Sequence, residues 1–102
     1  MDAASPPAAD TRAAPARWYA YFYLMKPERQ AVRRAAPQHA SYWNQLSLTG
    51  YIGGPFADLS GGLITFVARD HDHAQRLIDA DPFAREGLLE SLRLKEWIPT
   101  PG

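Results

Sequence analysis

The sequence contains no cysteine among its 102 residues. A disulfide framework, a thiolate nucleophile and a sulfur-ligated metal are therefore excluded. Structural disulfides are typical of oxidising compartments, so their absence fits a protein that works in a reducing one. We expect a cytoplasmic location on this ground.

The sequence also lacks an excess of charge and a long apolar run. Lys plus Arg and Asp plus Glu each total 11. Nucleic acids and anionic membranes select basic surfaces, and a bilayer span needs about 20 consecutive apolar residues. The composition therefore predicts neither a nucleic-acid partner nor a membrane segment.

Large apolar side chains are absent from residues 1–16 after Met1, where Ala, Pro and Asp dominate. Such a segment cannot bury enough surface to offset the entropy lost on ordering. It also has no apolar stretch of the kind that a secretory signal requires. We predict a disordered N-terminal extension over 1–16 and, from the chain length, a single domain over 17–99.

Two segments are typical of β-strands that are covered on both faces. Residues 18–25 (WYAYFYLM) are rich in aromatic side chains, and residues 63–69 (LITFVAR) are largely apolar. Successive side chains of a strand point to opposite faces, and in neither strand is one face polar. A shorter strand is expected over 51–56, and an alternating strand over 89–98.

Residues 28–48 have helical character, which Pro37 divides. Proline suits the first position of a helix and disfavours helical geometry in the residue before it. We therefore predict a helix that begins near Pro37, after a looser turn or short helix over 28–35.

Two further helices are expected, over 71–80 and over 82–86. The order of elements is then strand, helix, strand, strand, helix, strand, which is the βαββαβ pattern of a ferredoxin-like α+β fold with a four-stranded antiparallel sheet. Helices can cover only one face of that sheet. Because the strands are apolar on both faces, we predict a homodimer in which two sheets pack face to face.

A histidine and an aspartate stand at the starts of two predicted helices. His39, Trp43 and Leu46 fall at positions i, i+4 and i+7, which directs His39 toward the sheet. Asp81 precedes Pro82, as the N-cap residue of a helix often does. A histidine and a carboxylate in contact can perform general acid–base chemistry.

Each of these two residues also has a purely structural interpretation. His39 can be a core histidine bonded to a backbone carbonyl, and Asp81 can serve only as a helix cap. The two duties of Asp81 are compatible, because one carboxylate oxygen can cap while the other orients His39.

The run Asp70-His71-Asp72-His73 is not expected to bind a metal. Side chains at i and i+2 diverge by about 200° on a helix, so His71 and His73 cannot share a metal there. We predict solvent-exposed residues of a first helical turn and no metal site.

At this point the sequence resembles the YCII-related (YciI-like) family, a branch of the dimeric α/β-barrel superfamily. The resemblance covers residues 18–98 and rests on the order and spacing of short motifs, which are Pro37-Gln38-His39, Gly53-Gly54-Pro55, Asp79-Ala80-Asp81-Pro82-Phe83, Gly87 and a basic last strand ending near Trp97. It implies a ferredoxin-like protomer, a dimer, and a pocket between helices and sheet.

The resemblance marks His39 and Asp81 as candidate catalytic residues and Gly54 and Pro55 as pocket-lining backbone. One similar group removes HCl from chlorinated hydroxylated aromatics by acid–base chemistry. From the residues themselves, the aromatic side chains are candidates for binding a substrate, with a core or dimer-interface role as the alternative. The candidate substrate-binding set is Tyr21, Trp43, Gly54, Pro55 and Phe83.

Two classes of function follow. The first is a cofactor-free enzyme of lyase or isomerase type, in which Asp81 orients His39 as general base or acid on a small organic, possibly aromatic, substrate. The second is a non-catalytic module that binds a small molecule or a partner through the same pocket. A cofactor-free oxygenase is a third possibility that no residue specifically favours.

Overall fold

The computed structural model describes residues 17–101. The predicted extension over 1–16 lies outside the described residues. The elements follow one another as β1 (Arg17–Met25), α1 (Arg29–Gln45), β2 (Ile52–Pro55), β3 (Gly61–Ala68), α2 (His71–Asp79), α3 (Pro82–Arg85) and β4 (Leu89–Trp97).

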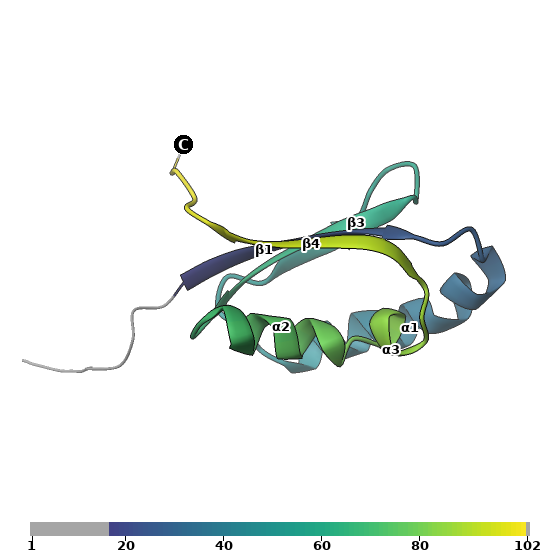
Figure 1. Ribbon diagram of the computed structural model, residues 1–102, viewed down its shortest axis with the longest axis horizontal. Helices are drawn as coiled ribbons and strands as arrows, with labels where there is room; N and C mark the ends of the chain where they lie inside the picture. Colours follow the sequence, from purple (N-terminus) through teal and green to yellow (C-terminus); the bar gives the residue numbers. More distant parts are fainter. Residues whose placement is uncertain (1–16, 102) are drawn as a thin grey trace, which may run out of the picture.

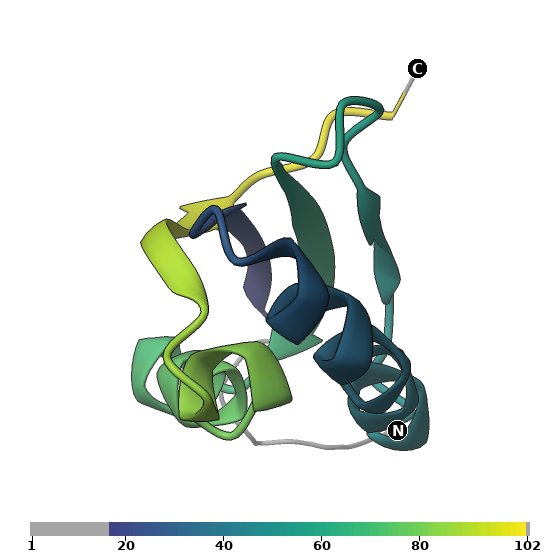
Figure 2. The same cartoon turned by 90° about the vertical axis from the view of Figure 1, so that its right-hand side faces the viewer.

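The strands form one antiparallel sheet in the order β2-β3-β1-β4. The helices lie together against one face of this sheet, which gives a molecule of two layers (Figure 1). Seen along the sheet, α1 lies beside α2 and α3 rather than above them (Figure 2). This arrangement confirms the predicted α+β, ferredoxin-like fold.

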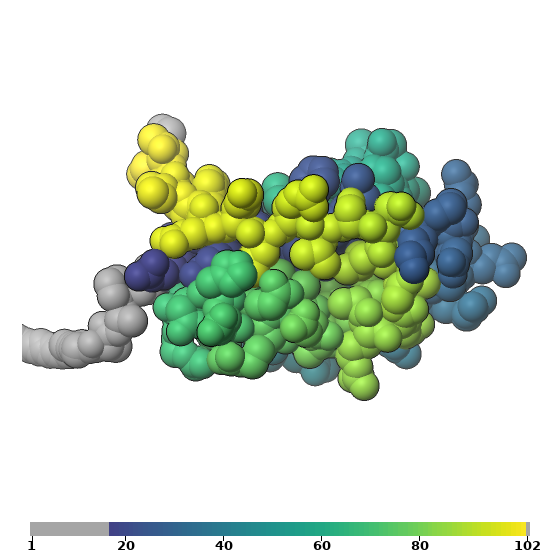
Figure 3. All heavy atoms as spheres, viewed as in Figure 1, coloured from purple at the N-terminus to yellow at the C-terminus, as the bar shows by residue number. Residues whose placement is uncertain are grey.

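Strand β1 occupies the centre of the molecule, because it pairs with both β3 and β4. Its alternate tyrosines Tyr19, Tyr21 and Tyr23 point toward the helices and are at most 4% exposed. They pack with Trp43 and Phe66 in the core. Side chains thus fill the space between the sheet and the helices, and no opening between these two layers is visible from the side that Figure 3 shows.

Helix α1 begins at Arg29, and Pro37 lies inside it. The prediction of a helix beginning near Pro37 is therefore wrong. A proline within a helix removes one hydrogen bond and crowds the carbonyl four residues earlier, which is that of Arg33. Pro37 and Arg33 are both exposed, so water can hydrate the freed carbonyl. The buried side chains of Ala35 and Trp43 hold the helix against the sheet on either side of the proline.

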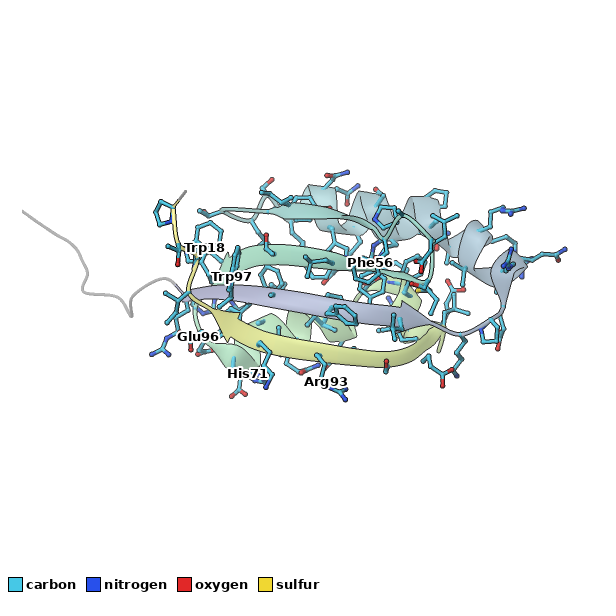
Figure 4. The ribbon with its side chains drawn as sticks, turned by 90° about the horizontal axis from the view of Figure 1, so that it is seen from above. Trp18, Phe56, His71, Arg93, Glu96 and Trp97 are labelled. Atoms are coloured by element: carbon cyan, nitrogen blue, oxygen red, sulfur yellow. The ribbon has the colours of Figure 1, made fainter. Side chains whose placement is uncertain are left out.

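The outer face of the sheet carries large apolar side chains that the described residues do not cover. Phe22, Leu63 and Trp97 keep 42%, 41% and 41% of their surface exposed. Figure 4 looks onto this face, where Trp18 and Trp97 lie edge to face with ring centres 6.2 Å apart. Contiguous exposed apolar surface is often an interaction site. The covering of this face by a second copy stays a prediction.

Two strand glycines offer a matched test of the sheet. A Cβ on Gly61 would lie 1.9 Å from the backbone oxygen of Tyr23, whereas a Cβ on Gly54 would meet nothing within 4 Å. Gly61→Ala must therefore push β3 away from β1, and we expect it to lower the free energy of unfolding by about 1–3 kcal/mol. Gly54→Ala should leave that free energy unchanged or slightly raised. Urea denaturation of both variants measures the difference, and equal stabilities would contradict the close approach of the two strands.

Candidate functional site

The fold brings His39 and Asp81 into direct contact. His39 comes from the middle of α1, and Asp81 lies between α2 and α3, 42 residues further along the chain. The ring nitrogen Nδ1 of His39 lies 2.8 Å from Oδ1 of Asp81 and 3.0 Å from Oδ2. The side chain of His39 thus lies on the inward side of its helix, as its helical position in the sequence predicted.

Asp81 is fully buried, with 0% of its surface exposed. It is the N-cap of α3, because its Oδ1 accepts a hydrogen bond from the backbone N–H of Phe83 at 2.9 Å. The indole Nε1 of Trp43 donates to its Oδ2 at 3.0 Å. A buried carboxylate is tolerated when donors surround it. Here the donors are a backbone amide, an indole and an imidazole.

The hydrogen bonds fix which nitrogen of His39 carries the proton. An ionised carboxylate only accepts hydrogen bonds, so Nδ1 of His39 donates to Asp81. In the neutral ring, Nε2 then holds a free lone pair. The ring itself stacks on Phe83, with centroids 4.1 Å apart and planes inclined by 15°. The imidazole is therefore fixed in its orientation by an aspartate at one edge and by an aromatic ring on one face.

The side chain that faces Nε2 is Tyr23, whose Oη lies 3.4 Å away. Burial first, and then the carboxylate of Asp81, raise the pKa of Tyr23 to about 12. Tyr23 is therefore a neutral phenol near neutral pH, and its Oη–H is the donor toward Nε2.

Glycine at position 62 makes room for this phenol. Tyr23 and Gly62 are directly opposite on β1 and β3. A Cβ on Gly62 would lie 2.3 Å from Oη of Tyr23 and 2.8 Å from the carbonyl oxygen of Gly54. The absence of a side chain at position 62 thus allows the phenol to lie over the backbone of the sheet.

Some of the remaining predicted site residues contact the His39–Asp81 pair, and others lie apart from it. Phe83 stacks on His39, and Trp43 is buried against Asp81. Tyr21 is fully buried, and its hydroxyl has no hydrogen-bond partner within residues 17–101. The carbonyl oxygen of Gly54 lies near Tyr23, because a Cβ on Gly62 would meet both that oxygen and the Tyr23 hydroxyl.

Pro55 is exposed at the end of β2. The structure records no contact that joins it to the His39–Asp81 pair. Its assignment to a pocket therefore stays a prediction.

Sequence reasoning missed Gly62 and considered Tyr23 only as one of several aromatic side chains that could line a pocket, outside the candidate set. The alternation of β1 placed Tyr23 on the same face as Tyr21, which is the one signal that pointed to it. Which of Tyr21 and Tyr23 faces His39 depends on the register of β1 against β3. A single sequence does not contain that register.

Two surface hollows lie outside this cluster. The larger, of about 480 Å³, is on the outer side of the sheet beside Phe22, Leu24 and Phe56. The smaller, of about 290 Å³, is lined by Gln38, Pro82, Arg85 and Glu86. The smaller hollow is thus lined by Gln38 and Pro82, the chain neighbours of His39 and Asp81, and not by the pair itself. The side chain of His39 is itself 14% exposed.

The histidines at the start of α2 have structural partners. Oδ1 of Asp70 caps the helix by accepting from the backbone N–H of His73 at 2.8 Å, and Nδ1 of His73 accepts from the backbone N–H of Arg69 at 3.1 Å. Burial lowers the pKa of His73, which favours the neutral imidazole that can accept that bond.

No group of three or more potential metal ligands occurs within residues 17–101. None of the helices described for that part of the chain is both long enough and apolar enough to cross a bilayer.

The fold and the buried histidine–aspartate pair define a ferredoxin-like α+β protein with a polar cluster between its sheet and its helices. The chain belongs to the family described by the YCII-related domain, whose family model matches residues 17–98. A comparison with curated proteins gave no significant sequence match.

Solved structures share the fold. The 5-chloro-2-hydroxyhydroquinone dehydrochlorinase TftG from Burkholderia phenoliruptrix AC1100, in complex with 2,5-dihydroxybenzoquinone, has a TM-score of 0.72 and 20% sequence identity, and the alignment covers 79% of this chain and 93% of that one. Rv0793 from Mycobacterium tuberculosis has a TM-score of 0.54 and 11% identity over 86% and 98% of the two chains. PA3566 from Pseudomonas aeruginosa has a TM-score of 0.53 and 15% identity over 87% and 97%.

The raised pKa of Tyr23 predicts a dependence of stability on alkaline pH. The unfolded phenol ionises near pH 10 and the folded one near pH 12. The folded state therefore holds an extra proton between these values, and its stability falls as the pH rises through that window. One such group contributes a slope of about 1.4 kcal/mol per pH unit. Tyr23→Phe removes that slope, while the buried Tyr21 keeps its own. Urea unfolding at several pH values between 10 and 12 should show a shallower fall for the variant, and identical slopes would contradict a buried phenol at position 23.

Proposed function

We propose that this protein is a cofactor-free enzyme in which His39, oriented by Asp81, transfers protons on a small hydroxylated aromatic substrate. The reaction is of lyase or isomerase type. The observation that carries the proposal is the 2.8 Å contact between Nδ1 of His39 and Oδ1 of Asp81, because it leaves Nε2 as the nitrogen that can accept a proton.

The electrostatics of the pair suit a histidine that gains and loses a proton. When Nε2 takes a proton, the ring becomes a cation beside the carboxylate of Asp81. The imidazolium is thus paired at once, inside a region where water does not screen the attraction. The backbone and indole donors to Asp81 hold the carboxylate in place during this change.

The surroundings of the pair suit a flat, mostly apolar substrate. Phe83 stacks on the imidazole, and the ring of Tyr23 lies 5.8 Å from it. Rings that meet aromatic faces and edges gain about 0.5–1.5 kcal/mol beyond simple burial. A hydroxylated ring offers both the aromatic surface and the acidic O–H that such a site can handle.

Dehydrochlorination illustrates the class of reaction. The structural neighbour TftG is a dehydrochlorinase of 5-chloro-2-hydroxyhydroquinone. Loss of HCl from such a ring requires that two hydroxyl protons leave, that one proton is added to the carbon bearing chlorine, and that chloride departs with the bonding electron pair. A hydroxyquinone remains, and no external oxidant is consumed. A single histidine can take the first proton, return it to the ring carbon and take the second as chloride leaves.

We also propose that two copies of the chain associate through the outer face of the sheet. The family resemblance implies a dimer, and the exposed side chains of Phe22, Leu63 and Trp97 form an apolar surface at the centre and end of that face. A domain of this size gains stability from such a partner. The cytoplasmic location expected from the composition accompanies this proposal as a prediction.

Anaerobic assays with two probes test the proton-transfer chemistry. With 5-chloro-2-hydroxyhydroquinone the measurement is chloride release, and with 1,2,4-trihydroxybenzene in D₂O it is the exchange of ring hydrogens, followed by NMR. We expect His39→Gln to lower both rates by about 100-fold or more, because general acid–base catalysis is typically worth that much. His71→Gln, the same change in an exposed residue of α2, should keep the wild-type rates.

Two outcomes would count against this assignment. Equal rates for His39→Gln and the wild type would remove His39 from the chemistry. Binding of the probes with neither exchange nor chloride release would favour the binding-module alternative.

A charge on the outer face tests the dimer. We expect the wild-type chain to sediment as a dimer at micromolar concentration and Phe22→Asp to sediment as a monomer, because an aspartate cannot be buried there without a partner. Ser41→Asp places the same charge on an exposed position of α1 and should remain dimeric. A wild-type monomer at micromolar concentration would contradict the proposal.

A further inference from the structure

One polar group of the cluster has no role in the chemistry derived so far. The hydroxyl of Tyr23 faces Nε2 of His39, the atom that would take the substrate proton. Tyr23 is 4% exposed, and its ring lies against Phe83 with centroids 6.1 Å apart. A hydroxyl at this point must lie beside any atom that delivers a proton to Nε2.

We propose that Tyr23 is a second catalytic residue, whose Oη–H donates a hydrogen bond to the substrate oxygen that becomes negative when His39 removes a proton. This inference rests on the proposed function. It adds a hydrogen-bond donor for the developing oxyanion to the general base, His39. It also narrows the substrate class to molecules with an oxygen conjugated to the reacting carbon, such as phenols and enols.

The length of the contact supports this role. An O–H donor in a strong hydrogen bond lies about 2.7–2.8 Å from its acceptor, whereas Oη of Tyr23 lies 3.4 Å from Nε2. The phenol and the imidazole therefore hold each other weakly. A substrate hydroxyl that lies to one side of both atoms could give its proton to Nε2 and share the proton of Oη, with each of these bonds of normal length.

The protonation state of Tyr23 fits the same role. Its pKa of about 12 keeps the proton on the phenol at neutral pH, so the group can donate. Burial strengthens a hydrogen bond to an oxyanion, because water is not present to compete for it. A charged donor is not needed at this position.

The proposed step conserves protons and electrons without an external oxidant or reductant. The substrate O–H or C–H bond breaks, its proton forms a bond with Nε2, and the electron pair stays on the substrate as an oxyanion or enolate. The proton of Tyr23 remains on Oη and is only shared with that oxygen. The imidazolium then returns its proton to a ring carbon, which gives the keto tautomer. Loss of the original hydrogen from that carbon to Nε2 restores the ring and completes an exchange, whereas loss of a leaving group with its own electron pair completes an elimination.

The neighbouring Tyr21 does not meet the same requirements. Its hydroxyl is also buried, but the structure records no contact between it and His39. The ring of Tyr21 packs instead on Tyr23 and Trp43, with centroids 5.0 and 6.1 Å away. The substrate-binding role that the sequence suggested for Tyr21 is therefore better filled by Tyr23.

Removal of a single oxygen tests the proposal. We expect Tyr23→Phe to lower kcat for ring-hydrogen exchange of 1,2,4-trihydroxybenzene by about 100-fold, the usual effect of losing one donor to an oxyanion, with KM changed less than threefold. Tyr19→Phe makes the same change on the same strand and face, at a position that contacts Phe66 and His71 rather than the site. This control variant should keep the wild-type kcat.

A second readout does not depend on turnover. In protein labelled with ¹⁵N-histidine, the Nε2 resonance of neutral His39 should move downfield in Tyr23→Phe, because it loses a hydrogen-bond donor. It should stay unchanged in Tyr19→Phe. An unchanged Nε2 resonance in Tyr23→Phe would overturn the contact on which the inference depends.

The outcomes separate this inference from the proposed function. If His39→Gln abolishes exchange while Tyr23→Phe keeps the wild-type kcat, the catalytic role of Tyr23 is wrong and the proposed function stands. If the wild-type protein catalyses no exchange, the proposed function fails, and the role of Tyr23 fails with it.

Discussion

The carboxylate of Asp81 is the constraint on which the site depends. A fully buried charge is costly unless donors surround it, and its three donors come from two helices. Trp43 and His39 belong to α1, and the backbone N–H of Phe83 belongs to α3. Helices α1 and α3 therefore have to meet at this point for the charge to be satisfied. The same bonds that stabilise the packing also fix the orientation of the imidazole.

The sheet contributes the other half of the cluster through a pairing of large and small residues. The central strand places Tyr23 opposite Gly62, where no side chain competes for the space that the phenol occupies. Gly61, the preceding residue, lets β3 approach β1 closely. The glycines of β3 thus serve both the pairing of the strands and the position of the hydroxyl that faces His39.

Much of this arrangement was predictable from the sequence, because some signals are local. The inward direction of His39 follows from helical phase, and the cap at Asp81 follows from the proline after it. The helix boundary at Pro37 was wrong, because packing outweighed a local preference. The bond between Trp43 and Asp81 and the approach of Tyr23 to His39 connect distant parts of the chain. They depend on how α1 crosses the sheet and on strand register, which no single segment specifies.

The structural and chemical duties of Asp81 are not alternatives in this fold. The sequence suggested one oxygen for the helix cap and the other for His39, but Oδ1 accepts from both the backbone of Phe83 and Nδ1 of His39. The oxygen that orients the imidazole is therefore itself held by a backbone amide, which has far less freedom to move than a side chain. By contrast, the 3.4 Å contact on the opposite edge of the ring is loose. A ring that is held firmly at Nδ1 and weakly at Nε2 has its reactive edge where a substrate can replace the weaker partner.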